Sequence, residues 1–347
     1  MPANLMDNDK CVVVGKPAWH GLGKNFTESI NAVDAHDAMG GSFELVKKQV
    51  GVMFDDEFIA IPDSFAIVRG STNKDPNDMV FGYCTNHYNI IQPLDILKKF
   101  DEKVGISIET IGLIQDGRKL FVTWKLPNFE VVSGDEIELF GAVMVGFDTV
   151  FSTRLNVLTT RILCENTFGL ALEEESAEKK KNRGRGTIYS SKHTNKNLLN
   201  ELGEWMSCVH QNAEKQTNLL KSLFGKFVAT PVIHEQQAKD LIYTAWPNPS
   251  PIPAVFPDAL RKDKQEKIDA EAERLEGLRV GIYDVFSTSK GIAIDENYWG
   301  LFNASTQYFN HEMKSKKDTS YSLVWGNRNG HMNHFAEVLR DDINKKG

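Results

Sequence analysis

The sequence lacks the features of several large protein classes. No stretch approaches 18 consecutive apolar residues, the minimum for a membrane-spanning helix. The N-terminus has neither the basic nor the apolar segment of a secretory signal, so we expect a cytoplasmic protein. Only four cysteines are present and none forms a C-x-x-C pair, which favours small packing residues over disulfides or zinc ligands.

Motifs for phosphate binding and for catalysis are also missing. Gly23-Lys24 and Gly225-Lys226 lack the earlier glycine and the following hydroxyl of a Walker A loop, and no G-x-G-x-x-G motif occurs. Cys164 is the one candidate nucleophile, at the start of a predicted helix whose dipole would lower a thiol pKa. Its neighbours supply neither a base nor a cation, so we interpret it as a packing residue. We therefore expect no cofactor, no metal and no catalytic residues.

What is present is typical of a globular protein. The chain has 347 residues, of which 41% are hydrophobic and 25% charged, enough for one large or two medium domains. The net charge of −7 argues against an affinity of the whole surface for DNA, but it does not exclude a local basic patch.

Apolar patterning predicts strands through most of residues 42–170. The clearest signal is a hairpin in which Asp116-Gly117 joins Ile106–Ile111 to Leu120–Leu126, because Asp-Gly favours tight hairpin turns. A helix is predicted at 93–103, with Pro93 in its first turn. Residues Val50–Ile67 are predicted to hold two β-rich runs split by Pro62-Asp63. Further strands are predicted at 79–91, 139–147 and 149–158, and a passage from strand to helix at 159–172.

The second half predicts helices. Apolar residues recur every three or four positions from Leu198 to Phe227, which indicates one long amphipathic helix with Thr194 as a possible N-cap. The prolines of 246–253 exclude a helix there and predict an exposed linker. Further helices are predicted at 234–245, 258–280, 297–315 and 331–343.

Together these elements predict an α+β fold. Its N-terminal half would be β-rich, with hairpins and a β-β-β-α-like core, and its C-terminal half mostly helical. The expected parts are an N-terminal arm at 1–41, an α+β core domain at 42–175, a basic flexible loop at 176–196 and a helical region at 197–347 with the proline-rich linker inside it.

Basic residues gather around the predicted hairpins and in the loop. Residues 179–200 contain seven Lys/Arg and no Asp or Glu. Strands that present cations and an aromatic ring can follow a phosphate backbone and stack on bases. The alternative is a set of solvated faces joined by a connector. The predicted nucleic-acid-binding residues are Lys119, Trp124 (for stacking), Lys125, Arg154, Arg161, Lys179, Lys180, Lys181, Arg183, Arg185, Lys192 and His193.

Two blocks, Pro17–Gly23 and Arg161–Leu172, resemble the phage/plasmid-like protein family, a domain-of-unknown-function family of mobile DNA. After the first block, Lys24 stands where the family has threonine. The block itself has two interpretations: an N-terminal arm that docks on the protein by burying Trp19, or a loop that binds a ligand. The resemblance implies a protein of the host bacterial cytoplasm. Further motifs similar to the family's are His193–Lys196, Phe302–His311 and Trp325-Gly326.

Two functions follow as hypotheses. The predicted strand and helix order is similar to the β-β-β-α core of phage annealing proteins, including the Red-beta-like and Erf-like recombinases. The first hypothesis is therefore a homo-oligomeric protein that binds or anneals single-stranded DNA without ATP, in recombination or replication of mobile DNA, with no membrane partner. The second is a host-interaction protein that blocks a defence system by sequestering a bacterial protein. An enzyme built around Cys164 or the Trp19-His20 segment comes third.

Overall fold

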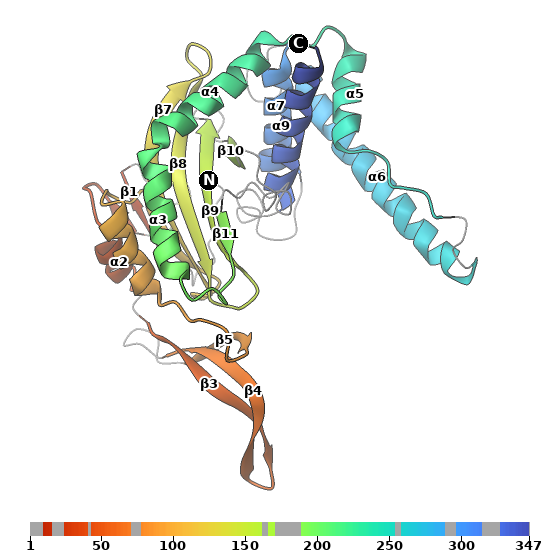
Figure 1. Cartoon of the computed structure of the whole chain (residues 1–347). Helices are drawn as coiled ribbons and strands as arrows, with labels where there is room; N and C mark the ends of the chain where they lie inside the picture. The colour runs from red at the N-terminus through yellow and green to blue at the C-terminus, as the bar shows by residue number, and fades with distance from the viewer. Residues whose placement is uncertain are drawn as a thin grey trace.

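The computed structural model describes residues 10–15, 24–40, 43–70, 78–161, 166–170, 189–253, 258–288, 296–313 and 327–346. Its N-terminal half is mainly strands and its C-terminal half mainly helices, which confirms the predicted α+β class (Figure 1). No helix in these ranges is long and apolar enough to cross a membrane.

The larger of two sheets has the strand order β10-β9-β8-β7-β6-β1-β2, and β11 pairs with β9 beyond the end of β10. The consecutive strands β6 to β10 are antiparallel, because each is joined to the next by a hairpin. β1 pairs with β6, so part of the predicted N-terminal arm belongs to this sheet. The bounds are β1 Lys10–Val14, β2 Lys24–Phe26, β6 Thr110–Ile114, β7 Lys119–Glu130, β8 Glu136–Gly146, β9 Thr153–Arg161, β10 Asn166–Leu170 and β11 Tyr189–Ser191.

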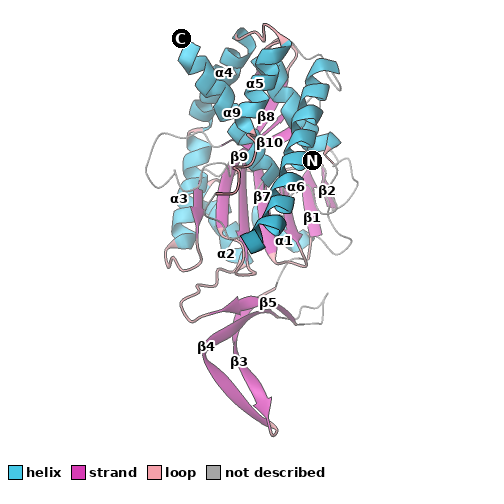
Figure 2. Cartoon of the chain, turned by 90° about the vertical axis from the view of Figure 1, so that its right-hand side faces the viewer, coloured by secondary structure: helices cyan, strands magenta, loops and turns pink. Residues whose placement is uncertain are grey.

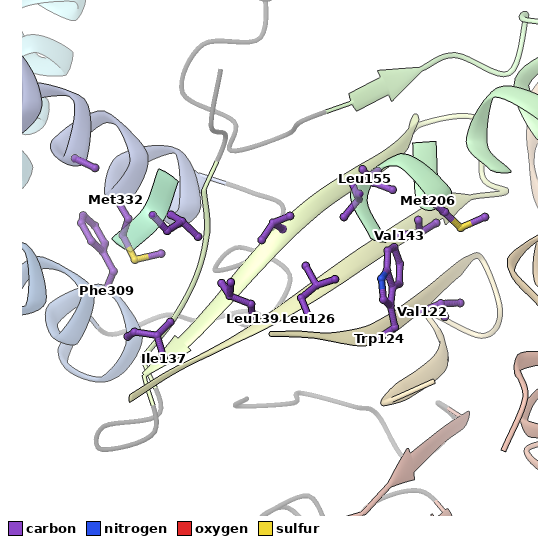
Figure 3. Close-up of a cluster of buried hydrophobic side chains, with 14 of the residues drawn as sticks. Val122, Trp124, Leu126, Ile137, Leu139, Val143, Leu155, Met206, Phe309 and Met332 are labelled. Atoms are coloured by element: carbon purple, nitrogen blue, oxygen red, sulfur yellow. The ribbon is translucent and has the colours of Figure 1, made fainter. Parts of the chain in front are cut away.

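One face of this sheet forms the main core. Side chains alternate along a strand, so Val122 and Trp124 of β7 lie on the same face as Val143 of β8. Figure 3 shows these side chains together with Leu155 of β9 and Met206 of α3. Trp124 is 0% exposed, and each such side chain contributes about 1.5–3 kcal/mol to folding.

Two helices, α3 (Leu198–Gln211) and α4 (Ala213–Ala229), lie along this face, where one long helix was predicted (Figure 1). The chain bends at Asn212, whose side-chain amide donates to Cys208 O at 2.9 Å and so ends α3. The bend lets α3 follow β8 and β9 while α4 crosses β7. The N-cap position of α3 is Asn197, so the predicted cap at Thr194 is wrong.

Two further helices are α1 (Ala32–Ala38), which contacts β1 and β6, and α2 (Pro93–Lys103), which contacts α1 and α3. The bounds of α2 agree with the prediction, and Pro93 stands in its first turn. Phe100 of α2 reaches the main core, with its ring centroid 5.4 Å from that of Trp124.

The C-terminal helices share the core of the sheet. The ring of Trp299 lies 4.7 Å from that of Phe224 of α4, with the planes tilted by 40°, and its indole N–H donates to Asp135 in the β7–β8 turn at 2.9 Å. Trp246 was predicted to lie in an exposed linker, but its side chain is only 3% exposed, and its indole N–H donates to His331 Nδ1. The bounds are α5 Glu235–Ala245, α6 Asp258–Thr288, α7 Tyr298–Gln307, the π-helical turn η2 Tyr308–Glu312 and α9 Asn327–Lys346.

Residues 159–172 differ from their prediction. No helix starts in their described part, because β9 continues to Arg161 and Asn166–Leu170 forms β10, an edge strand on β9. Cys164 and the segment Pro17–Gly23 lie outside the described residues.

The smaller sheet has the order β3-β4-β5, with bounds β3 Leu45–Phe54, β4 Glu57–Arg69 and β5 Met79–Cys84. A break was predicted at Pro62-Asp63, but β4 runs through it, and the turn lies at Asp55-Asp56, both with positive φ. β5 pairs only with residues 65–69 of β4. The rest of β3 and β4, residues 49–64, projects alone from the molecule (Figures 1 and 2), and we call it the hairpin arm.

Candidate nucleic-acid interface

The face of the main sheet opposite α3 and α4 carries a second, smaller hydrophobic cluster. Met144 of β8 and Leu158 of β9 point to this face, and both belong to one cluster with Ala142 and with Phe151, which precedes β9. Phe121 and Phe140 lie partly buried against them. Strand alternation thus supplies aromatic side chains on both faces of the sheet.

Phe151 is held by the turn between β8 and β9. Asp148 Oδ1 accepts hydrogen bonds from the backbone N–H groups of Val150 and Phe151, each at 3.1 Å. Gly146 leaves room for Phe151 because it has no side chain: a Cβ added at this position would lie only 2.6 Å from Phe151 Cβ and would clash with it. The turn therefore fixes the ring between the ends of β7 and β9.

Two of the predicted binding residues meet at this ring. Arg154 of β9 lies over Phe151 with its guanidinium carbon 4.5 Å from the ring centroid, and Lys119 Nζ of β7 lies 5.5 Å from it. A cation over an aromatic face is attracted by the ring quadrupole. The structure thus brings together two cations that are 35 positions apart in the sequence.

The two cations differ in their access to solvent. Lys119 is 8% exposed, so its side chain is part of the packing under Phe151 and the prediction of an open phosphate contact is wrong for it. Arg154 is half-buried, and its Nε donates to Ser152 Oγ at 3.4 Å. Arg154 is therefore the member of this pair that a phosphate can reach.

Residues 171–188 connect β10 to β11, the two strands that pair with the outer side of β9. We call them the basic segment for the five Lys/Arg at 179–185, which follow four Glu at 173–178. β10 ends at Leu170 and β11 begins at Tyr189, and both strands pair with β9. Ser190 of β11 is the register partner of Arg154. The intervening residues, with Lys179, Lys180, Lys181, Arg183 and Arg185, lie outside the described ranges.

Lys192 and His193 follow β11 directly, but they differ in burial. Lys192 is exposed and can meet a phosphate. His193 is 4% exposed, Nδ1 lies 3.3 Å from Asn89 O, and Nε2 lies 3.3 Å from Thr153 Oγ1. Burial lowers the pKa of His193, so the ring is neutral at pH 7 and the prediction of a phosphate-binding imidazole is wrong.

His193 instead joins the two sheets. Its ring stacks on Tyr88, which follows β5, with centroids 5.0 Å apart and 3° between the planes. Burial, with the charge of Asp148 nearby, raises the pKa of Tyr88, so the phenol stays protonated. Gly82 of β5 also packs on the β8–β9 turn, because an added Cβ would lie 2.5 Å from Asp148 O.

The remaining predicted residues lie elsewhere. Trp124 is buried in the main core, so its indole cannot stack on a base and that prediction is wrong. Lys125, in the middle of β7, is exposed but lies 3.8 Å from Glu109, whose carboxyl pKa is raised by burial. Arg161 ends β9, and its side chain is outside the described part of the structure.

The sequence analysis missed Phe151 and Tyr88. Both fall in stretches predicted as strands, 149–158 and 79–91, whereas the structure places Phe151 in the turn before β9 and Tyr88 in the loop after β5. Their contacts depend on segments distant in sequence, which strand periodicity does not reveal. Among the described residues, no group of three or more His, Cys, Asp or Glu side chains is placed to hold a metal ion.

The molecule is an α+β protein whose large antiparallel sheet has a helical layer on one face and an aromatic cluster with basic residues on the other. Residues 80–329 match the family model DUF932, a domain of unknown function, so the chain belongs to the DUF932 family. No curated protein and no solved structure matches the chain. The match includes β6 to β11 and leaves the hairpin arm outside.

Proposed function

We propose that this protein binds single-stranded DNA and anneals strands without ATP, at the edge of the main sheet that β10 and β11 form on β9. The observation that carries the proposal is the attachment of the basic segment. It leaves from β10 and returns through β11, both of which pair with β9, beside Arg154. Lysine and arginine neutralise phosphates whatever the base sequence, so a basic segment fixed at both ends suits a strand of any sequence.

The aromatic cluster supports the same proposal. Phe121 and Phe140 are partly buried on the same face of the sheet as Arg154, away from α3 and α4. Stacking of bases on such rings needs no particular base, as annealing of any sequence requires. The resemblance of the motifs to phage and plasmid proteins adds the context: recombination or replication of mobile DNA in a bacterial cytoplasm, by a homo-oligomer.

The test is fluorescence anisotropy with a labelled oligo-dT at about 50 and 200 mM salt. If about five phosphates are neutralised, the slope of log K against log salt is about −3.5 for a single strand. Replacing Lys179, Lys180 and Lys181 together by alanine should reduce the steepness of that slope by about 2. Arg154→Gln should reduce it by about 0.7.

A matched control is available on α6. Lys262, Lys264 and Lys267 are exposed on this helix, and replacing all three by alanine changes the net charge equally. This control should leave the slope unchanged. A flat salt response, or an equal loss in the control, would contradict the proposal, and no binding at low salt would favour sequestration of a host protein instead.

A further inference from the structure

The hairpin arm exposes apolar side chains on both of its faces. Six of these side chains are between 41% and 65% exposed: Val52, Met53, Phe54, Phe58, Ile59 and Ile61. In the main sheet, by contrast, apolar strand residues such as Trp124 and Val143 are buried. A two-stranded hairpin alone in water is only marginally stable. The unpaired backbone N–H and C=O groups of an exposed apolar edge strand can form hydrogen bonds with a strand of another chain. The arm therefore has the properties of a surface that another chain covers.

The two edges of the arm differ in their protection. Along β4 the edge contains Pro62, which has no N–H to donate, and Asp63, whose φ of 51° interrupts the extended backbone. Such features prevent edge pairing. From Gln49 to Phe54 the β3 edge has no proline and no residue of positive φ, and β3 is the outermost strand of its sheet. Pairing is thus open on β3.

The sequence of β3 is complementary to itself in the antiparallel direction. β3 ends at Phe54 and its register with β4 shifts between Gln49 and Gly51, so uninterrupted alternation places only Val52 and Phe54 on one face. Lys48 comes before the shift, and Asp56 lies in the turn, with a positive φ. Set against a second copy with Val52 opposite Val52, the apolar residues Val50–Phe54 of the two copies lie side by side, and the acidic turn of each copy lies next to the Lys48 end of the other copy's β3.

We propose that β3 of the hairpin arm pairs antiparallel with β3 of a second copy of this chain, about a two-fold axis at Val52. A two-fold axis perpendicular to a sheet places a residue opposite itself and makes every other contact twice. The acidic turn, Asp55 and Asp56 followed by Glu57, makes a lipid surface a poor partner, since these carboxylates would enter it first. They would also repel a nucleic acid. The pairing goes beyond DNA binding and does not depend on it.

Charge exchange tests the pairing by sedimentation equilibrium. Lys48→Glu alone, or Asp56→Lys alone, places like charges near each other at both ends of the paired strands, and should weaken the dimer about tenfold. The double variant restores opposite charges and should recover the wild-type dissociation constant. Lys262→Glu on α6 is the control for net charge and should have no effect.

A cysteine at the axis gives a second, geometric measurement. Val52→Cys should form a disulfide between two copies under mild oxidation, because directly opposed Cβ atoms lie about 4.5–5.5 Å apart. Val150→Cys, at a side chain 88% exposed but away from the arm, is the control and should remain free. A wild-type chain that stays monomeric at about 100 µM, or a dimer that survives both single charge changes, would overturn the proposal.

Discussion

The main sheet and the hairpin arm are built from the same kind of strand but have opposite surroundings. In the main sheet, α3 and α4 cover one face, and Trp124 and Val143 are 0% and 1% exposed. In the arm, Met53 and Phe54 are 65% and 64% exposed on a ribbon that no helix covers. The comparison shows that an apolar strand pattern specifies a face to be buried but not what buries it. In the first case the partner is in the same chain, and for the arm we propose a second copy.

The largest expected difference between the two regions is in stability. Trp124→Ala should lower the free energy of unfolding by about 3–5 kcal/mol, because it leaves a cavity beside Phe100 in the main core. Urea unfolding followed by circular dichroism measures the change. A loss below about 1 kcal/mol would show that the indole does not fill the core.

Gly141→Ala probes the closeness of packing in the same core. An added Cβ at this β8 position would lie 2.1 Å from the Trp124 ring, so the ring must move. We expect a loss of about 1–3 kcal/mol in the unfolding free energy. Gly225→Ala in α4, where nothing lies within 4 Å of the added Cβ, is the control and should stabilise by about 0.5–1 kcal/mol.

The contact between the two regions should depend on pH through His193. Its pKa is lowered by burial, so the unfolded chain takes up a proton first as the pH falls below about 6.5. The stability from the neutral ring is therefore present above that pH and is lost below it, until the lowered folded pKa is reached. His193→Gln should make unfolding midpoints less sensitive to pH between 7 and 5.

The variant His331→Gln is the control for the pH dependence of the unfolding midpoint. The pKa of His331 is also lowered, mainly by burial, whereas a hydrogen bond to Glu337 raises the pKa of His334. Both histidines lie in α9, away from the joint between the sheets. The protection factor of the Asn89 amide, which donates to His193 O, should fall in acid only where His193 is present, after correction for the intrinsic pH dependence of exchange. An equal fall in His193→Gln would contradict the prediction.

The smallest effect is expected in the arm. Phe54→Ala should change the unfolding free energy by less than about 0.5 kcal/mol at micromolar protein, because the ring is largely exposed in one copy of the chain. The same variant should weaken self-association. A large loss of stability at low concentration would mean that the arm is held by its own chain.

Periodicity and turn chemistry in the sequence determined most of the elements. Pro93 started α2, Asp116-Gly117 closed the β6–β7 turn, and helical spacing marked α3 to α6 and α9. Elements follow from local patterns because backbone preferences and alternation act within a few residues. The bend at Asn212 and the strand β10 were missed, since each depends on the surface against which the segment packs.

The candidate site was determined mainly by the tertiary structure. Lysines, arginines and aromatic residues on strands were visible in the sequence, but both faces of β7 carry them. Only the pairing of β7, β8 and β9 shows that Trp124 faces the helices while Lys119 and Arg154 meet at Phe151. Which face a helix covers is decided by contacts between distant segments, and these are not encoded in the period of any single strand.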